Sequence, residues 1–249
     1  MNQKTGSIVG LTVSASKYNE TSAVVTLATE EKGLVSFLCN RIYDAKSQLK
    51  PMLIIGSTVE VFYSERGTSA YTARQVRVVY DGSSLYQSYV KTCFLLLMQE
   101  LCGKFFDFGD SFPVKEAQSI VSALADGNDP LSLSLLLVGS LYRSLGITID
   151  TAECVLCHAK ENIVSCDLEM GGLLCDDCAK RKGIAVRDNM TLHVMRYAFM
   201  KPDGKNLSKK VPQANGEGVL RELCSYLCSY FDTKEIKSLL PFIEACRSL

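Results

Sequence analysis

The chain has 249 residues, of which 47% are hydrophobic and 22% are charged, and its formal net charge at pH 7 is zero. These values are ordinary for a soluble globular protein. They argue against a protein that binds nucleic acid over its whole surface. No apolar run reaches the roughly 18 residues that a membrane-spanning helix needs, and the opening MNQKTGSIVGLTV lacks the apolar core of a secretion signal. We therefore expect a cytoplasmic protein without membrane association, whose eleven cysteines stay reduced.

The first 80 residues show the alternation that is typical of β-strands. Turn residues at 17–20, 30–33 and 65–68 separate short runs that are alternating or wholly apolar. The predicted strands are 7–13, 22–29, 33–39, 58–63 and 70–80. Five short strands in so few residues predict a small closed barrel, for which the oligonucleotide-binding (OB) fold is the commonest architecture. An SH3-like barrel is the alternative that the strand count leaves open.

From residue 84 the spacing of apolar residues becomes helical. In the first helix one predicted stripe contains Leu85, Tyr89, Cys93, Leu96 and Leu97. Further helices are predicted at 113–125, 131–145, 190–201, 217–230 and 233–247, with a loop-like linker at 205–218. Asp129 and Pro130 supply an N-cap and a first-turn proline for the helix at 131–145. Asp232 and Glu235 suggest a capping box for the last helix, and Pro241 a kink in it.

The overall prediction is an α+β protein. It comprises an N-terminal five-stranded OB barrel at residues 1–80 and an α-helical domain at 81–249. A cysteine-rich module at 150–185 interrupts the helical domain. That module contains CVLCHAKENIVSCDLEMGGLLCDDC, in which Cys154, Cys157, Cys175 and Cys178 fit the spacing C-x2-C-x17-C-x2-C. The spacing is that of zinc ribbons and related sites, because two residues between cysteines let one tight turn aim both sulfurs at one metal ion.

Two other interpretations of the cysteines remain open, a thioredoxin-like redox pair and buried thiols that hold no metal. A redox pair would follow a strand in an α/β unit, which is absent from the predicted pattern. His158 and Cys166 are possible substitute ligands, but four cysteines already complete a tetrahedral site. A closed shell of four thiolates carries no water to activate, so we expect one structural zinc ion per chain.

Catalytic motifs are missing from the sequence. It contains no HExxH, GxSxG, GxGxxG or P-loop pattern, and it has only two histidines, His158 and His193. The spacing of CHAKE at 157–161 also differs from that of the zinc deaminases. The sequence therefore predicts a protein that is not an enzyme.

Basic and aromatic residues in the predicted barrel mark a candidate nucleic-acid face. Cations neutralise phosphates, and flat rings stack on bases. The candidates are Lys17 and Tyr18 in the first turn, Arg41, Tyr43, Lys46 and Lys50 after the third strand, and Arg74 and Arg77 on opposite faces of the last strand. A second basic cluster, in or beside the linker at 205–218, is either a further contact or a solvated loop. Its members are Lys201, Lys205, Lys209 and Lys210.

The order of these parts resembles the bacterial RecO family of DNA repair proteins. The resemblance rests on the GSIV start, the YNETSAVVTLATEEKGL strand–turn–strand, the AKSQLKPM segment, the LYRSLGI helix end and the GGLLCDDC knuckle. These elements cover most of the chain in the family order. The resemblance implies an N-terminal OB domain and a helical domain with an inserted zinc module.

The resemblance also implies a function, that of a non-enzymatic recombination mediator in the bacterial nucleoid. RecO proteins bind single- and double-stranded DNA and anneal complementary strands. With RecR they help RecA replace single-strand-binding protein (SSB), whose tail they contact. The stretch CNRIYDAKS retains Arg41 and Lys46 but has less charge than the family's usual KGARR-x-x-S run. This departure leaves an alternative open, a scaffold that bridges SSB and RecR with little direct DNA binding.

Overall fold

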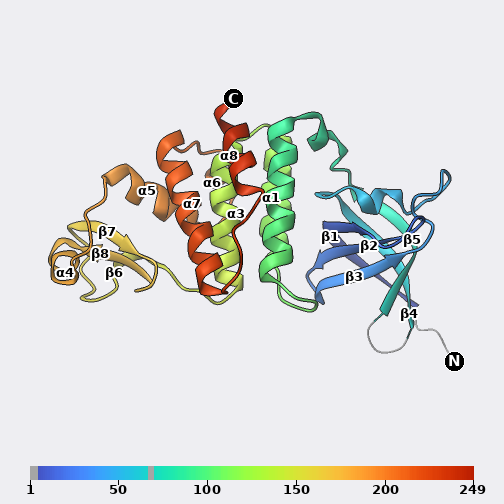
Figure 1. Cartoon of the computed structure of the whole chain (residues 1–249), viewed down its shortest axis with the longest axis horizontal. Helices are drawn as coiled ribbons and strands as arrows, with labels where there is room; N and C mark the ends of the chain where they lie inside the picture. The colour runs from blue at the N-terminus through green and yellow to red at the C-terminus, as the bar shows by residue number, and fades with distance from the viewer. Residues whose placement is uncertain (1–4, 67–69) are drawn as a thin grey trace.

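The computed structural model describes residues 5–66 and 70–249, and its three parts follow one another along the longest axis (Figure 1). The β-barrel lies at one end, a bundle of helices lies in the middle, and a small three-stranded sheet with one short helix lies at the other end. The predicted turn at 65–68 falls partly outside the described residues. No helix among the described residues is long and apolar enough to cross a membrane.

Five antiparallel and parallel strand pairings close the barrel. The strands are β1 (Thr5–Lys17), β2 (Ala23–Thr29), β3 (Gly33–Cys39), β4 (Thr58–Arg66) and β5 (Ala70–Tyr80). Their order is β1-β2-β3-β5-β4, with β1 also paired to β4 and β3 parallel to β5. Inward-facing residues such as Val25, Phe37 and Val61 fill the interior, as the alternation along each strand predicts. The predicted five-stranded OB-type barrel is confirmed.

The helical body is arranged around one central helix. The elements are a 3-10 helix (Ser83–Gln87), α1 (Tyr89–Phe105), α2 (Val114–Ala125), α3 (Pro130–Ser144), α5 (Asn189–Ala198), α6 (Gly204–Leu207), α7 (Gln213–Tyr230) and α8 (Leu239–Arg247). In α3 every residue from 130 to 142 is buried, because α1, α2, α5, α7 and α8 all pack on it. A helix that is apolar on all sides belongs at the centre of a body of this kind. The predicted α+β class, barrel first and helices after, is confirmed.

A few apolar residues of the barrel pack into the core of the helical body. Leu11 and Leu34 of the barrel belong to the same buried cluster as the helices. Backbone hydrogen bonds reinforce the junction, since Leu34 N donates to Asp110 O at 3.1 Å and Gly109 N donates to Leu34 O at 2.9 Å. The loop between α1 and α2 is thus hydrogen-bonded to the start of β3, next to the β2–β3 turn. The barrel therefore packs directly against the helical body.

The first helix differs from the predicted stripe. Leu85 lies in the preceding 3-10 helix, so Ser88 interrupts the helical phase. Tyr89 and Leu96 are exposed, while Cys93 and Leu97 are buried as expected. The reason is that α1 contacts β1 on one side and α8 on the other, which makes its buried surface wider than one stripe and differently oriented.

The C-terminal part also differs from the prediction. The last helix begins at Leu239 rather than at residue 233. Asp232 has a positive φ of 49° just after α7, so it ends one helix instead of capping the next. Pro241 lies in the first turn of α8, where a missing N–H group is tolerated and no kink is needed. The predicted linker at 205–218 is largely helical, because it contains most of α6 and the start of α7.

Asp129 caps α3 as predicted. Its carboxylate accepts hydrogen bonds from Ser132 N at 2.9 Å and from Ser132 Oγ at 2.6 Å. We expect Asp129→Ala to lower the free energy of unfolding by about 1 kcal/mol, the usual effect of removing such a cap. Urea denaturation against the wild type measures this, and an unchanged midpoint would contradict the capping role.

The small module is inserted between α3 and α5. It consists of β6 (Asp150–Cys154), β7 (Ile163–Asp167), β8 (Gly172–Cys175) and α4 (Asp176–Lys182). The sheet order is β6-β8-β7, with β7 and β8 forming an antiparallel hairpin. Two chain reversals, one after β6 and one between β8 and α4, therefore lie beside each other.

Candidate metal centre and candidate nucleic-acid interface

The first reversal presents two cysteines. Cys154 ends β6, and Cys157 follows in a turn closed by a 2.8 Å hydrogen bond from His158 N to Cys154 O. Burial opposes ionisation of the Cys154 thiol, but backbone N–H groups of Cys175, Leu156 and Cys157 donate to its sulfur and lower its pKa to about 6. Backbone donors directed at a sulfur favour the thiolate, which is the form that binds a metal.

The second reversal presents the other pair. Cys175 ends β8 and precedes α4, so Cys178 lies in the first turn of that helix. The chain can enter β8 only because residue 172 is glycine, with φ of 153°. A Cβ atom there would lie 2.2 Å from Asp150 O. The glycine thus permits the close approach of β8 to β6 that brings the two pairs together.

The four thiols form one cluster. The Sγ atoms of Cys154, Cys157, Cys175 and Cys178 all lie within 4.8 Å of one another, and those of Cys157 and Cys175 are 3.5 Å apart. Four sulfurs at about 2.3 Å from a tetrahedral zinc ion would be separated by about 3.8 Å. The donor set and its spacing therefore fit a metal ion, and Cys157 is the exposed member of the set.

The other two candidate ligands lie elsewhere. The His158 ring turns away to Glu153, with 2.7 Å between Nδ1 and Oε1. Cys166 lies in β7 and is buried in the main apolar cluster of the body. A residue that the sequence reasoning missed is Arg181, whose guanidinium donates to the Cys178 sulfur at 2.9 Å. Its position one helical turn after Cys178 was the available signal, because residues three apart share a helix face.

A bidentate ion pair joins the module to the helical body. Arg187 donates to both carboxylate oxygens of Glu222 in α7, at 2.5 and 2.7 Å. The backbone N–H of Arg187 also donates to Val164 O in β7 at 2.9 Å. In addition, Arg196 of α5 donates to Thr151 O of β6 at 3.3 Å. Sequence reasoning missed this connection, because the two partners of the ion pair are 35 residues apart.

The candidate nucleic-acid residues of the barrel loops are partly brought together. Tyr43 N donates to Thr21 O at 3.3 Å, so the segment after β3 touches the β1–β2 turn that follows Lys17 and Tyr18. Tyr18 and Tyr43 are both exposed. The region between β3 and β4 contains turns and a 3-10 helix (Lys50–Leu53). This arrangement places two aromatic rings and several cations on neighbouring loops.

Local partners neutralise part of this charge. Arg41 pairs with Asp44, with 2.7 Å between Nε and Oδ2. Lys50 donates from Nζ to Ala45 O at 3.1 Å and so closes its own loop. Lys46 is exposed and forms no ion pair with the described carboxylates. The loop therefore presents less free positive charge than its composition suggests.

Arg74 and Arg77 lie on the same outer surface, which corrects the prediction of opposite faces. Arg74 donates to Ser64 Oγ at 2.9 Å, and Arg77 pairs with Glu60 at 2.5 Å. Val59, Val61 and Tyr63 of β4 pack into the barrel core, so Glu60 and Ser64 alternate to the other face, where Ser64 is covered. A bulge in the β4–β5 pairing between Phe62 and Tyr63 shifts the alternation, and strict periodicity could not anticipate it.

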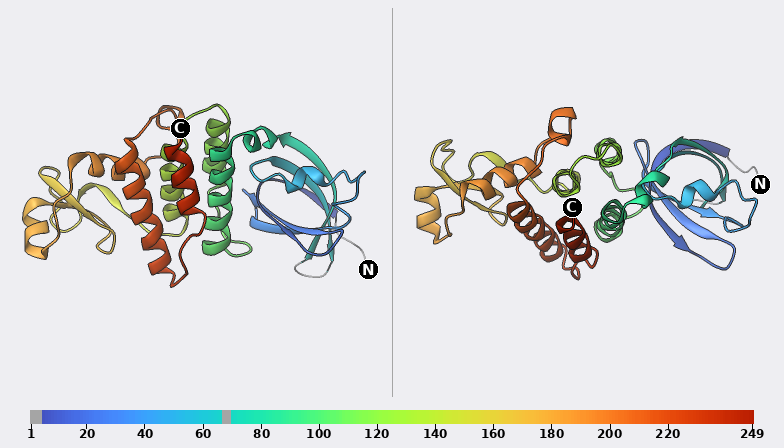
Figure 2. Two further views of the ribbon diagram at one scale, coloured as in Figure 1. Left: turned by 45° about the horizontal axis from the view of Figure 1, so that its top comes forward. Right: turned by 90° about the horizontal axis from the view of Figure 1, so that it is seen from above.

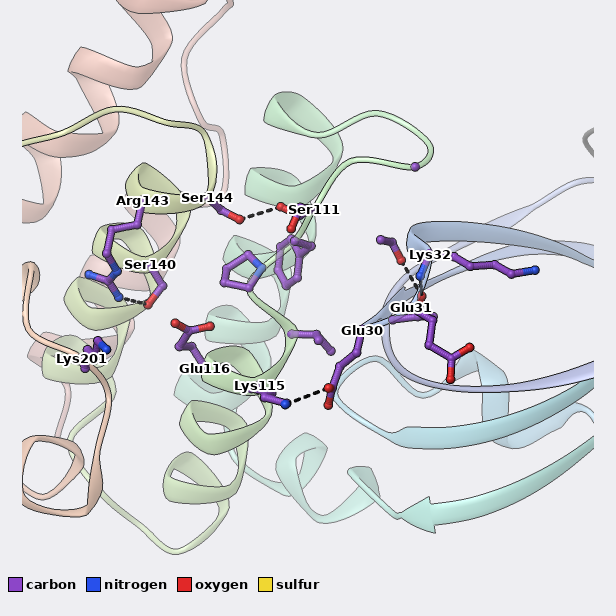
Figure 3. A pocket seen from close by; sticks show the side chains of 16 residues that line it. Glu30, Glu31, Lys32, Ser111, Lys115, Glu116, Ser140, Arg143, Ser144 and Lys201 are labelled. Atoms are coloured by element: carbon purple, nitrogen blue, oxygen red, sulfur yellow. Dashed lines mark hydrogen bonds and ion pairs between the residues drawn. The ribbon is translucent and has the colours of Figure 1, made fainter.

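A cleft of about 760 Å³ lies between the β2–β3 turn of the barrel and helices α2 and α3 (Figure 3). Lys115 pairs with Glu30 across it at 2.8 Å, and Glu31 and Lys32 line the same barrel side. On the α3 side, Arg143 donates to Ser140 Oγ at 2.8 Å, and Lys201 lines the same cleft. Glu116 also lines the cleft near Arg143, so the cleft contains charges of both signs.

The relatives compared with this chain are each named DNA repair protein RecO. A family model described as "Recombination protein O N terminal" matches residues 3–81. The chain is 23% identical over 232 residues to the DNA repair protein RecO of Oceanobacillus iheyensis, covering 90% of this chain and 86% of that protein. It is 22% identical over 230 residues to the DNA repair protein RecO of Bacillus cytotoxicus, covering 90% of each. The family model and these relatives support a relationship to the RecO family.

The matches agree with the architecture. The family model ends at residue 81, directly after β5, so the RecO family match covers the barrel. The relative from Bacillus mycoides, also named DNA repair protein RecO, is 21% identical over 227 residues and covers 90% of both chains. The likeness to the RecO relatives therefore extends through the helical body and the cysteine module.

Proposed function

We propose that this chain is a DNA repair and recombination mediator that binds single- and double-stranded DNA and anneals complementary strands. The observation that carries the proposal is the closed OB barrel, to which the RecO N-terminal family model matches. OB barrels bind single strands through their loops and one strand face, with cations along the backbone and rings stacked on bases. The chemistry needs no bond to be made or broken, so the protein acts without catalysis.

The proposed barrel contacts are the eight residues predicted from the sequence. Lys17, Tyr18, Arg41, Tyr43, Lys46 and Lys50 supply the loops, and Arg74 and Arg77 extend the surface along β5. Because backbone contacts carry no sequence information, strands of any sequence would bind. Two strands held on one protein meet at a raised effective concentration, which speeds their annealing.

The proposal includes partners and a location. Together with a RecR-like protein, the chain would help RecA replace SSB on single-stranded DNA, in contact with the SSB tail. The site of action would be the cytoplasm, at the nucleoid. The barrel at 1–80 would contact DNA, while the helical domain at 81–249, with the module at 150–185, would contact the protein partners.

The cysteine cluster is proposed to hold one structural Zn²⁺ ion. Cys154, Cys157, Cys175 and Cys178 would be its four ligands, and a bound ion supplies folding free energy to the module. Four thiolates leave no open position for water. The four cysteines would hold the two chain reversals together through the ion. Arg181 offsets part of the negative charge at Cys178.

Replacing Arg41, Lys46 and Lys50 by Ala tests the barrel interface. We expect weaker binding of labelled single strands and slower annealing, with the slope of log K against log salt reduced by about 0.7 for each phosphate that the variant no longer neutralises. A control variant with the same change in net charge replaces three exposed lysines outside the barrel by Ala. These are Lys182, Lys234 and Lys237. If the loop variant and the control anneal equally well, the barrel loops are not the interface.

A scaffold that bridges SSB and a RecR-like protein is the second candidate function. The ion pairs Arg41–Asp44 and Arg77–Glu60 favour it, because they neutralise cations that DNA binding would use. Gel shifts at low salt separate the two functions. Binding of a single strand at micromolar protein supports the mediator, and no shift under these conditions supports the scaffold.

A further inference from the structure

Four lysines gather at one corner of the helical body, between α5 and α7. Lys201, Lys205, Lys209 and Lys210, here called the basic corner, are all exposed. Between residues 199 and 212 the only acidic residue is Asp203. Its carboxylate accepts the hydrogen bond of Asn206 N at 3.2 Å, as the N-cap of α6. None of the four lysines pairs with a carboxylate within 4.0 Å in the part of the chain that is described, although eight other lysine or arginine ion pairs form there.

The backbone that carries the basic corner is held firmly in place. Tyr197 donates from its hydroxyl to Asn206 O at 2.9 Å, and Asn206 Nδ2 donates to Lys201 O at 2.9 Å. Val211 N donates to Ser132 Oγ of α3 at 3.0 Å. The like charges are therefore fixed near one another instead of separating on a loose loop. Fixed, uncompensated like charges repel each other and raise the local potential that attracts an anion.

Members of the basic corner border a hollow at each of its ends. At one end Lys201 shares the cleft of Figure 3 with Arg143, whose guanidinium donates to Ser140 Oγ at 2.8 Å and to Phe199 O at 3.1 Å. Burial lowers the pKa of Arg143, and Glu116 nearby opposes this without forming an ion pair within 4.0 Å. At the other end, Lys209 and Lys210 border a second hollow of about 290 Å³.

Apart from Lys201, which shares a cleft with the β2–β3 turn, the basic corner is separate from the barrel. Seen from above, α6 stands out from the body on the side opposite α7 and α8, while the barrel lies at the end of the molecule (Figure 2). A strand held at the barrel would leave this corner free. The corner is also rich in lysine, which acts as a point charge on phosphate, rather than in arginine, which suits planar carboxylates.

We propose that the basic corner is a second binding surface for the phosphate backbone of a nucleic acid strand. This second surface rests on the proposed function and extends it. One strand lies at the barrel, and its complement lies across α6 between the two hollows. An extended polyanion fits a row of cations that reaches from Arg143 to Lys210 better than a compact acidic peptide does. Bringing both strands onto one protein converts a bimolecular encounter into an intramolecular one.

Replacing all four lysines by Gln tests this surface. We expect the variant to anneal complementary oligonucleotides at least ten-fold more slowly than the wild type, with a shallower dependence of the rate on salt. Binding of one short labelled strand should fall much less, because the barrel still holds it. The control replaces Lys160, Lys182, Lys234 and Lys237 by Gln, which changes the net charge equally at exposed positions elsewhere. It should anneal like the wild type.

The possible results separate the two proposals. Wild-type protein that neither binds nor anneals strands overturns the proposed function and the second surface together. Wild-type protein that anneals, alongside a corner variant that anneals at the same rate, overturns only the second surface. If that variant instead loses binding of a poly-glutamate peptide while annealing normally, the corner recognises an acidic protein and the proposal is wrong. Equal urea midpoints of the variant and its control establish that folding is unchanged.

Discussion

Cys175→Ser is expected to abolish stoichiometric zinc binding and to unfold the cysteine module. The wild type should contain one zinc ion per chain by elemental analysis, and the variant far less than one. Structural zinc sites of this kind contribute on the order of 10 kcal/mol of apparent binding free energy, which becomes folding free energy when the site does not exist in the unfolded chain. Cys175 joins β8 to α4 at the second reversal, and its Sγ lies 3.5 Å from that of Cys157 in the first reversal.

Cys166→Ala is the matched control for the metal prediction. Cys166 is a buried cysteine of the same module, but it lies in β7 and packs into the apolar core. Its replacement should lower stability by about 1 kcal/mol, because the missing sulfur leaves a small void, and should leave the zinc content at one per chain. Wild-type protein that purifies without zinc, and that cannot be loaded with it, would contradict the assignment of the cluster as a metal site.

Loss of zinc should raise the rate of hydrogen exchange most in the cysteine module and least in the barrel. Hydrogen exchange should become fast across 150–185, and next in the segments tied to it by Arg187 and Glu222. The barrel lies at the opposite end and has its own buried cluster, so its exchange should stay slow. Elements with few apolar contacts of their own open first, while a packed barrel opens only with the whole domain.

Features set by local spacing were predictable from the sequence. The two Cys-x-x-Cys pairs fold into reversals because two residues between the cysteines decide the geometry locally, and the five strands follow from alternation within each run. The cap at Asp129 is local as well, since donor and acceptor lie three residues apart. Such short-range rules need no knowledge of the remaining chain.

Features set by packing between distant segments were not predictable. The β4–β5 bulge places Arg74 and Arg77 on one side, and only the pairing of two strands reveals it. The start of α8 depends on Glu100, which accepts hydrogen bonds from Lys237 N and Ser238 N across a separation of 137 and 138 residues. The charge of the loop between β3 and β4 was also not predictable. Its composition indicated free positive charge, whereas the fold pairs Arg41 with Asp44.

Gly139→Ala is expected to destabilise the protein by about 1–3 kcal/mol or more, the usual range for overpacking a core. Gly139 lies in α3 where the end of α5 crosses it, and a Cβ atom would lie 1.8 Å from Ala198 O and 3.3 Å from Phe199 Cα. These neighbouring atoms belong to the backbone, so α5 would have to move. That movement would disturb the Arg143–Phe199 hydrogen bond and the edge-to-face packing of Tyr142 on Phe199.

Gly103→Ala is the control, because it makes the same change in a helix where there is room. Gly103 lies in α1, is exposed, and would have no atom within 4 Å of an added Cβ. Alanine in place of glycine then stabilises a helix by about 0.5–1 kcal/mol through reduced freedom of the unfolded chain. Thermal unfolding should therefore shift down by several degrees for Gly139→Ala and slightly up for Gly103→Ala. Shifts of the same sign and size would mean that helix propensity, and not the close approach of α3 and α5, decides both positions.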